Sequence, residues 1–274
     1  WSVTGVQTCA LPISYVAEIE HLPDFPDNIR RIMEACNDDK SDARTIAHEI
    51  SQDAAIASAI IRLANSGGFA GGHISDLLEA VKIVGIRNIS GLLLNVGAIG
   101  ILEKHFGLTE ELHNHPIKVA AYSRFLARKF KLARIADAAY VAGLLHDIGR
   151  VVLAARLTEK EAYEKAAAIE PAYRLSIEEM TCGINHAELG AMLARKWNFP
   201  DHLSAAIEFH HAPYLALPEH RDLVFTVYLA NAIADYELTK VNFYTLEPEV
   251  LQTFSINSRQ AFEMLAALLQ NQAL

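Results

Sequence analysis

From residue 15 onward, apolar residues recur almost without pause at intervals of three and four along the chain. This spacing is typical of amphipathic α-helices, because it places the apolar side chains on one face. It is clearest over residues 46–64, in the order Ile46, Ile50, Ala54, Ala57, Ile60, Ile61 and Ala64. No segment shows the alternation of a half-buried strand. The pattern therefore predicts an all-α protein.

Proline and glycine divide this pattern into roughly a dozen helices, since neither residue suits a helix interior. The breaks fall at Pro23, Pro26, the segment 65–73, Pro116, Pro171, Pro200 and the segment 213–218. Two capping-box spacings predict helix starts, and they are formed by Thr158 with Glu161 and by Asn185 with Glu188.

The distribution of ligand-type residues predicts two lobes, because residues 15–108 contain few of them and residues 109–240 contain most of the histidines. We expect packing helices over residues 241–274, with a core formed by Phe254, Phe262, Met264 and Leu268. Residues 1–14 show neither the helical spacing nor the charged start of a secretory signal. They resemble a translated sequencing-adapter fragment, and we expect them to be non-native.

Composition excludes several classes of protein. A chain of 274 residues with 51% hydrophobic content can bury a large core, which excludes disorder. The net charge of -9, without any cluster of Lys and Arg, excludes a nucleic-acid polymer as partner. No apolar run approaches the ~20 residues of a membrane-spanning helix. Cys9, Cys36 and Cys182 lie far apart, which argues against a disulfide framework and favours the cytoplasm.

The stretch GLLHDIGRVVL places His146 and Asp147 inside an aliphatic run. A buried carboxylate is costly unless a cation compensates it. On one helix these neighbours would point about 100° apart and could embrace a metal ion beside the axis. Arg150, one turn further, is the alternative partner in a purely structural salt bridge. We favour the metal, and we expect Gly143 and Gly149 to permit close helix approach.

Other side chains that bind metals gather in the same half of the chain, namely Glu111, His115, His186, His210 and His211. Glu111 and His115 stand four residues apart, so on a helix they would either bind one cation or form an ordinary surface pair. A lone histidine is more often a hydrogen-bonded residue than a ligand. We interpret His48, His73, His105, His202 and His220 in that way.

Several blocks of the chain carry a family resemblance. The blocks HPIKVAAYSRFLARKF, GLLHDIGRVVL, NHAELGAMLARKW, AIEFHHAPY and VYLANAIAD are similar in order and spacing to the HD superfamily of metal-dependent phosphohydrolases. Ahead of them, HLPDFPDNIRRIMEACND, HEISQDAAIASAIIRLANSGGF and ISDLLEAVKIVGIRNISGLLL resemble the amino-terminal lobe of the HDOD family, the HD-related output domains of bacterial signalling proteins. The resemblance covers residues 20–235 approximately. It implies an HD-domain-like helical bundle with an additional amino-terminal helical lobe.

Carried over position by position, the resemblance implies a set of metal ligands consisting of Glu111, His115, His146, Asp147, His186, His210 and His211. The chain departs from the family at the closing aspartate, where Asn231 stands and Asp235 follows one turn later. An amide oxygen can coordinate a cation but contributes no negative charge, so we expect Asn231 to be a weaker ligand.

The resemblance leaves two functions open. One is a regulatory module that binds a signalling protein partner, with any metal serving to hold helices together, and we favour it slightly. The other is a metal-dependent phosphohydrolase acting on a nucleotide or other phosphoester, with Asp147 as the catalytic carboxylate and Arg150 as a phosphate clamp. The implied cofactor is one or two ions of iron, manganese, nickel or zinc, or none. The segment APYLALP lacks the GYP motif, so we do not expect hydrolysis of cyclic-di-GMP.

Overall fold

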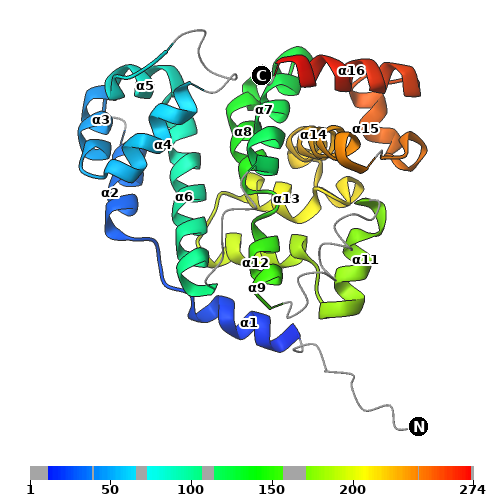
Figure 1. Cartoon of the computed structure of the whole chain (residues 1–274), viewed down its shortest axis with the longest axis horizontal. Coiled ribbons are helices and arrows are strands. Elements are labelled where there is room, and N and C mark those ends of the chain that lie inside the picture. The colour runs from blue at the N-terminus through cyan, green and yellow to red at the C-terminus, as the bar shows by residue number, and fades with distance from the viewer. Residues whose placement is uncertain are drawn as a thin grey trace.

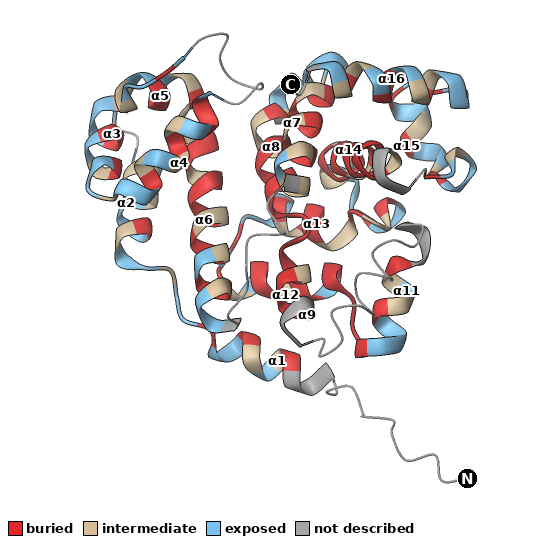
Figure 2. Ribbon diagram, in the orientation of Figure 1, coloured by how far each residue is buried: buried red, intermediate tan, exposed pale blue. Residues whose placement is uncertain are grey.

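The computed structural model describes residues 12–38, 40–65, 73–106, 114–156, 171–239 and 241–272, and within these ranges it contains helices and no β-strand. The predicted all-α class is confirmed. Figure 1 shows a group of helices on each side of the long helix α6 (Ile86–Phe106). Figure 2 shows that the buried residues line the helix faces turned toward their neighbours.

The first group consists of α2 (Asp27–Asn37), α3 (Ala43–Ser51), α4 (Ala54–Ala64) and α5 (Leu77–Val84). Helices α2, α4 and α5 pack against α6, and α3 packs against these three helices. Aspartates fix three of the helix starts, because their carboxylates accept hydrogen bonds from backbone N–H groups of the first turn. Asp42 caps α3, Asp53 caps α4 and Asp76 caps α5. The apolar faces of these helices form one cluster, which includes Ile32, Ile46, Ile50, Ile60, Val81 and Leu93.

The second group surrounds the candidate site. It consists of α7 (Asn114–Lys129), α8 (Ala136–Leu145), α9 (Ile148–Arg156), α11 (Pro171–Cys182), α12 (His186–Lys196), α13 (Asp201–Phe209) and α14 (Arg221–Thr239). Helix α7 packs on α8 and α14, while α9 packs on α12. The first helix, α1 (Pro12–His21), lies against α12 and buries Tyr15 and Ile19 in the cluster of this second group.

The chain ends in α15 (Pro248–Thr253) and α16 (Arg259–Gln272). The predicted core positions Phe254 and Phe262 are buried, and Leu268 packs against the same cluster. The prediction for Met264 is wrong, since this side chain is 67% exposed. Met264 follows Phe262 by two residues, which places it on the opposite side of the helix.

The structure also tests the predicted helix starts. Asn185 caps α12, because its side chain accepts a hydrogen bond from the backbone N–H of Glu188. The start near Thr158 lies outside the described residues. None of the described helices has the length and the apolar content that crossing a bilayer requires.

Candidate metal centre

His146 and Asp147 do not lie within one helix, which corrects the sequence prediction. They form a two-residue turn between α8 and α9. His146 is fully buried, and its Nδ1–H donates a hydrogen bond of 2.8 Å to the carbonyl oxygen of Gly143. This bond turns the Nε2 atom of the ring toward Asp147, whose Oδ2 lies 3.4 Å away.

Two glycines bring the neighbouring helices close to this turn, as predicted. A Cβ atom on Gly143 would lie 2.6 Å from the Cα of Ala120 on α7. A Cβ atom on Gly149 would lie 2.0 Å from the carbonyl oxygen of His186 on α12. Because real Cβ atoms do not approach backbone so closely, only glycine permits α8 and α9 to pack at these distances.

His186 is the first residue of α12, and a buried glutamate from α11 holds its ring. The Oε2 atom of Glu178 accepts hydrogen bonds from the backbone N–H of His186 at 2.8 Å and from its Nδ1–H at 2.6 Å. The Nε2 atom of His186 therefore faces the site, where Asp147 Oδ1 lies 3.3 Å away. Glu178 is 4% exposed, so solvent does not compete strongly for this carboxylate.

His210 and His211 directly follow α13. The Nδ1–H of His210 donates a hydrogen bond of 2.7 Å to the carbonyl oxygen of Ile207, which directs its Nε2 atom inward. That Nε2 atom lies 3.2 Å from His186 Nε2 and 3.5 Å from Asp147 Oδ1. The rings of His210 and His211 are neighbours, with centroids 4.2 Å apart. The buried Nε2 atom of His211 has no hydrogen-bond partner among the described residues.

The remaining predicted residues lie on the other side of Asp147. The Nε2–H of His115, at the start of α7, donates a hydrogen bond of 2.9 Å to Asn231 Oδ1 on α14. The same His115 nitrogen lies 3.9 Å from Asp147 Oδ2. Arg150 donates a hydrogen bond of 2.9 Å to that oxygen. Asp147 Oδ1, in contrast, accepts no well-formed hydrogen bond from the described residues.

Burial and charge together set the protonation of these groups. Burial lowers the pKa of His210 to about 4 and the pKa values of His211 and His115 below their usual range, which favours neutral imidazoles. Burial alone would raise the pKa of Asp147, but its interactions with His146 and with the Arg150 guanidinium hold it well below its usual value. Burial lowers the pKa of His186, but the hydrogen bonds and negative charges of Asp147 and Glu178 outweigh the effect of burial, so the pKa of His186 is raised.

The structure thus brings seven of the predicted site residues together around Asp147, namely His115, His146, Arg150, His186, His210, His211 and Asn231. Glu111 lies outside the described residues. Sequence reasoning missed Glu178, and it also missed Arg174, whose guanidinium donates to Asp235 at 3.4 Å within the buried space beside the site. Neither residue stands in a motif. Their positions depend on how α11 packs, so local spacing gives no signal for them.

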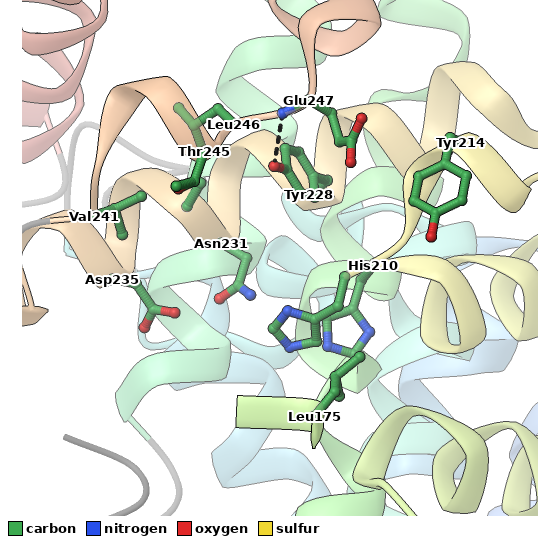
Figure 3. A pocket seen from close by; sticks show the side chains of 12 residues that line it. Leu175, His210, Tyr214, Tyr228, Asn231, Asp235, Val241, Thr245, Leu246 and Glu247 are labelled. Carbon is green, nitrogen blue, oxygen red and sulfur yellow. Dashed lines mark hydrogen bonds between the residues drawn. The ribbon is translucent and has the colours of Figure 1, made fainter. Parts of the chain in front are cut away.

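A cavity of about 250 Å³ adjoins the histidine side of the site. His210, His211 and Asn231 belong to its lining, and Figure 3 shows Tyr214 and Glu247 on the side away from Asp235. The cavity wall contains the two carboxylates of Asp235 and Glu247 and no Lys or Arg among the described residues that line it. The cavity that His210 and His211 border is thus large enough for a small molecule.

An all-helical fold with a histidine–aspartate centre defines an HD-type protein, and the sequence comparisons specify the family. The HDOD domain profile matches residues 22–213, and the chain belongs to the HDOD family. A protein of Treponema pallidum (strain Nichols), itself described as uncharacterised, is 31% identical over 274 residues. That alignment covers 97% of this chain and 52% of the relative, so the chain spans about half the length of this relative.

Solved structures share the fold. A candidate phosphohydrolase of Shewanella amazonensis SB2B is 22% identical, with a TM-score of 0.66 and coverage of 94% of this chain and 93% of that chain. An HDOD domain protein of unknown function from Geobacter sulfurreducens is 21% identical, with the same TM-score and the same coverage. A candidate signal transduction protein of Marinobacter aquaeolei VT8 is 19% identical, with a TM-score of 0.70, and the match covers 95% of this chain and 62% of that chain. These likenesses confirm the expected HD-like helical architecture.

Proposed function

We propose that this HDOD protein is a bacterial signal-transduction module that binds a divalent transition metal at the histidine–aspartate centre. One observation carries the proposal. The Nδ1–H groups of His146, His186 and His210 donate to oxygen acceptors, so a neutral ring presents a bare Nε2 lone pair. Two of these nitrogens lie 3.2 Å apart and both face Asp147 Oδ1. Lone pairs and a carboxylate at such distances repel one another unless a metal ion or a proton lies between them.

The donor set suits such a cation. Neutral imidazole and carboxylate are the ligands that zinc, iron, manganese and nickel accept in mixed nitrogen and oxygen sites. Three buried atoms that could coordinate a metal have no hydrogen-bond partner among the described residues, namely His146 Nε2, Asp147 Oδ1 and His211 Nε2. Buried polar atoms are normally satisfied, so these three support the presence of a cation beside Asp147. The carboxylate of Glu178 behind His186 is the kind of outer partner that orients metal-binding histidines.

Metal analysis tests this proposal. Protein purified without chelators should retain a divalent metal, and Asp147→Asn should remove it because the substitution takes away the negative charge of the aspartate that the candidate histidine ligands surround. Asp24→Ala, at an exposed position, serves as the control and should leave the metal content unchanged. Metal-free wild-type protein that also fails to bind added Zn²⁺, Mn²⁺, Fe²⁺ or Ni²⁺ would contradict the proposal.

A second function, phosphoester hydrolysis, is favoured by the cavity that reaches His210 and His211. A bound divalent metal supplies Lewis acidity and lowers the pKa of a bound water molecule. Asp147 and the histidines would hold it, and Arg150 or Arg174 would stabilise negative charge on the phosphoryl group. No Lys or Arg among the described residues lines the cavity to balance several phosphates, so we expect a small monoester rather than a dinucleotide.

The two functions predict different results in a phosphoester screen. A hydrolase loaded with metal should turn over a small phosphate ester and lose this activity on Asp147→Asn, whereas Asp24→Ala should retain it. A regulatory module should turn over none of the esters and should instead bind a signalling protein. We also propose that this module works in the cytoplasm and that its partner is a signalling protein.

A further inference from the structure

Two groups of potential ligands meet at Asp147, and they use different oxygens of its carboxylate. The first group contains His115, His146 and Asp147. The second group contains Asp147, His186, His210 and His211. Oδ2 is the oxygen nearest to the first group, and Oδ1 is the oxygen nearest to the second. Whether each oxygen is already hydrogen-bonded to the protein therefore decides which group can bind an ion.

Protein atoms already engage two members of the first group, Asp147 Oδ2 and His115, whereas His146 Nε2 has no hydrogen-bond partner among the described residues. Arg150 donates a hydrogen bond of 2.9 Å to Asp147 Oδ2, so a guanidinium charge stands where a cation would bind. His115 donates its Nε2–H to Asn231 Oδ1 at 2.9 Å, and a protonated nitrogen has no lone pair for a metal. Asn231 adds no negative charge. A cation on this side would be repelled by the positive charge of Arg150 and would have to share Asp147 Oδ2 with it.

The second group places its donor atoms at distances that suit an ion. The distances among Asp147 Oδ1, His186 Nε2 and His210 Nε2 are 3.2, 3.3 and 3.5 Å. Ligands of a four-coordinate ion with bonds of about 2.0–2.1 Å stand about 3.3 Å apart, so these three atoms already match the geometry of one ion. A ring nitrogen of His211 lies within 4.8 Å of the other ligand atoms, and its buried Nε2 atom lacks a hydrogen-bond partner among the described residues.

We propose that the centre binds one metal ion, through Asp147 Oδ1, His186, His210 and His211, and that Asn231 and Arg150 keep the His115 side free of metal. This assignment rests on the proposed metal binding and goes further, since it fixes the number of ions and their ligands. It also gives the asparagine at position 231 a definite effect, which is to prevent a second ion from binding.

Histidine substitutions on the two sides test the assignment. Zn²⁺ binding to metal-free protein is measured by titration calorimetry, and the bound metal is counted by mass spectrometry. Wild type should bind one equivalent. His115→Gln should still bind one equivalent with an affinity within about threefold of wild type. His211→Gln should bind at least about tenfold more weakly, because it removes a ligand.

Replacing the asparagine provides a gain of function. Asn231→Asp supplies the missing carboxylate and should raise the Zn²⁺ content from one equivalent toward two. Asn231→Leu is the matched control, because it keeps the size and removes the amide, and it should remain at one equivalent. Circular dichroism establishes that each variant is folded. Anomalous diffraction from wild-type crystals soaked in Zn²⁺ locates the ion without any substitution, and the peak should lie beside Oδ1 of Asp147.

The outcomes separate this assignment from the proposed function. Wild-type protein that binds no metal would overturn both. Wild-type protein with two equivalents, or an anomalous peak beside Oδ2, would overturn only the assignment. The same holds if His115→Gln loses the metal while His211→Gln retains it.

Discussion

At the scale of single residues, Glu178 controls the orientation of His186. One carboxylate oxygen accepts both the backbone N–H and the Nδ1–H of this histidine, at 2.8 and 2.6 Å. We expect Glu178→Gln to weaken metal binding by about 10–100-fold, because removal of such an outer partner misorients the ligand and lowers its basicity. A competition titration with a chromophoric chelator measures the change.

The control for this substitution lies on the same helix as His186. Glu188 is exposed on α12, and Glu188→Gln removes the same charge without touching the site. Its metal affinity should stay within about twofold of wild type. Equal losses in the two variants would mean that the net charge of the protein, and not the orientation of His186, governs the affinity.

The individual ligands show how far the sequence can predict a site of this kind. His146 with Asp147, His186, and His210 with His211 stand in motifs, and the structure brings all five residues together. Glu178 reaches His186 because α11 and α12 meet across a short turn in which Gly183 has a positive φ of 72°. An exposed neighbour, Glu179, has the same side chain, so composition alone does not distinguish the two glutamates.

At the scale of helices, the crossing of α9 and α12 depends on Gly149. A Cβ atom at this position would stand 2.0 Å from the carbonyl oxygen of His186 and 2.5 Å from the backbone nitrogen of Gly190. We expect Gly149→Ala to cost more than about 2 kcal/mol of folding free energy, since overpacking a core typically costs ~1–3 kcal/mol and the colliding atoms here are backbone. Metal binding should weaken as well, because Asp147 and His186 are then pushed apart. Denaturant unfolding and metal titration measure the two effects.

A second glycine provides a control for which alanine should increase the folding stability. Gly100 lies in α6 and is exposed, and a Cβ atom added to it would meet no atom of the described residues within 4 Å. Gly100→Ala should stabilise the protein by about 0.5–1 kcal/mol, because alanine favours the helical state. Destabilisation of both variants by similar amounts would show that the close approach at Gly149 is not the cause.

The helices also show where sequence patterns lose their predictive value. The aliphatic run around the HDIG motif has a helical spacing, and this spacing alone predicts a continuous helix. The chain instead turns at His146 and Asp147, since the close approach of α7 at Gly143 and of α12 at Gly149 fixes the directions of α8 and α9 separately. Such contacts join segments far apart in the sequence, so a local pattern cannot report them.

At the scale of the whole molecule, α7 and α8 connect the two apolar clusters. Ala120, Tyr140 and Leu144 belong to the cluster of the amino-terminal helices. Val119 and Leu145, on the same two helices, belong to the cluster that surrounds the site. A shared pair of helices makes it difficult for one cluster to unfold without the other. We therefore expect the helices on the two sides of the predicted boundary near residue 108 to unfold in one transition.

Thermal unfolding with and without metal tests this coupling. Saturation at about 100 times the dissociation constant stabilises the folded state by ~2.7 kcal/mol, and a chain of this size gains about 2–4 °C for each kcal/mol. We expect Zn²⁺ to raise the Tm of one single transition by about 5–10 °C in wild type and in Asp24→Ala, and to have no such effect in Asp147→Asn. Two transitions, of which only one responds to Zn²⁺, would show that the amino-terminal helices fold independently of the metal centre. In that case the shared faces of α7 and α8 contribute too little to unite the two clusters, and the boundary near residue 108 separates two folding units.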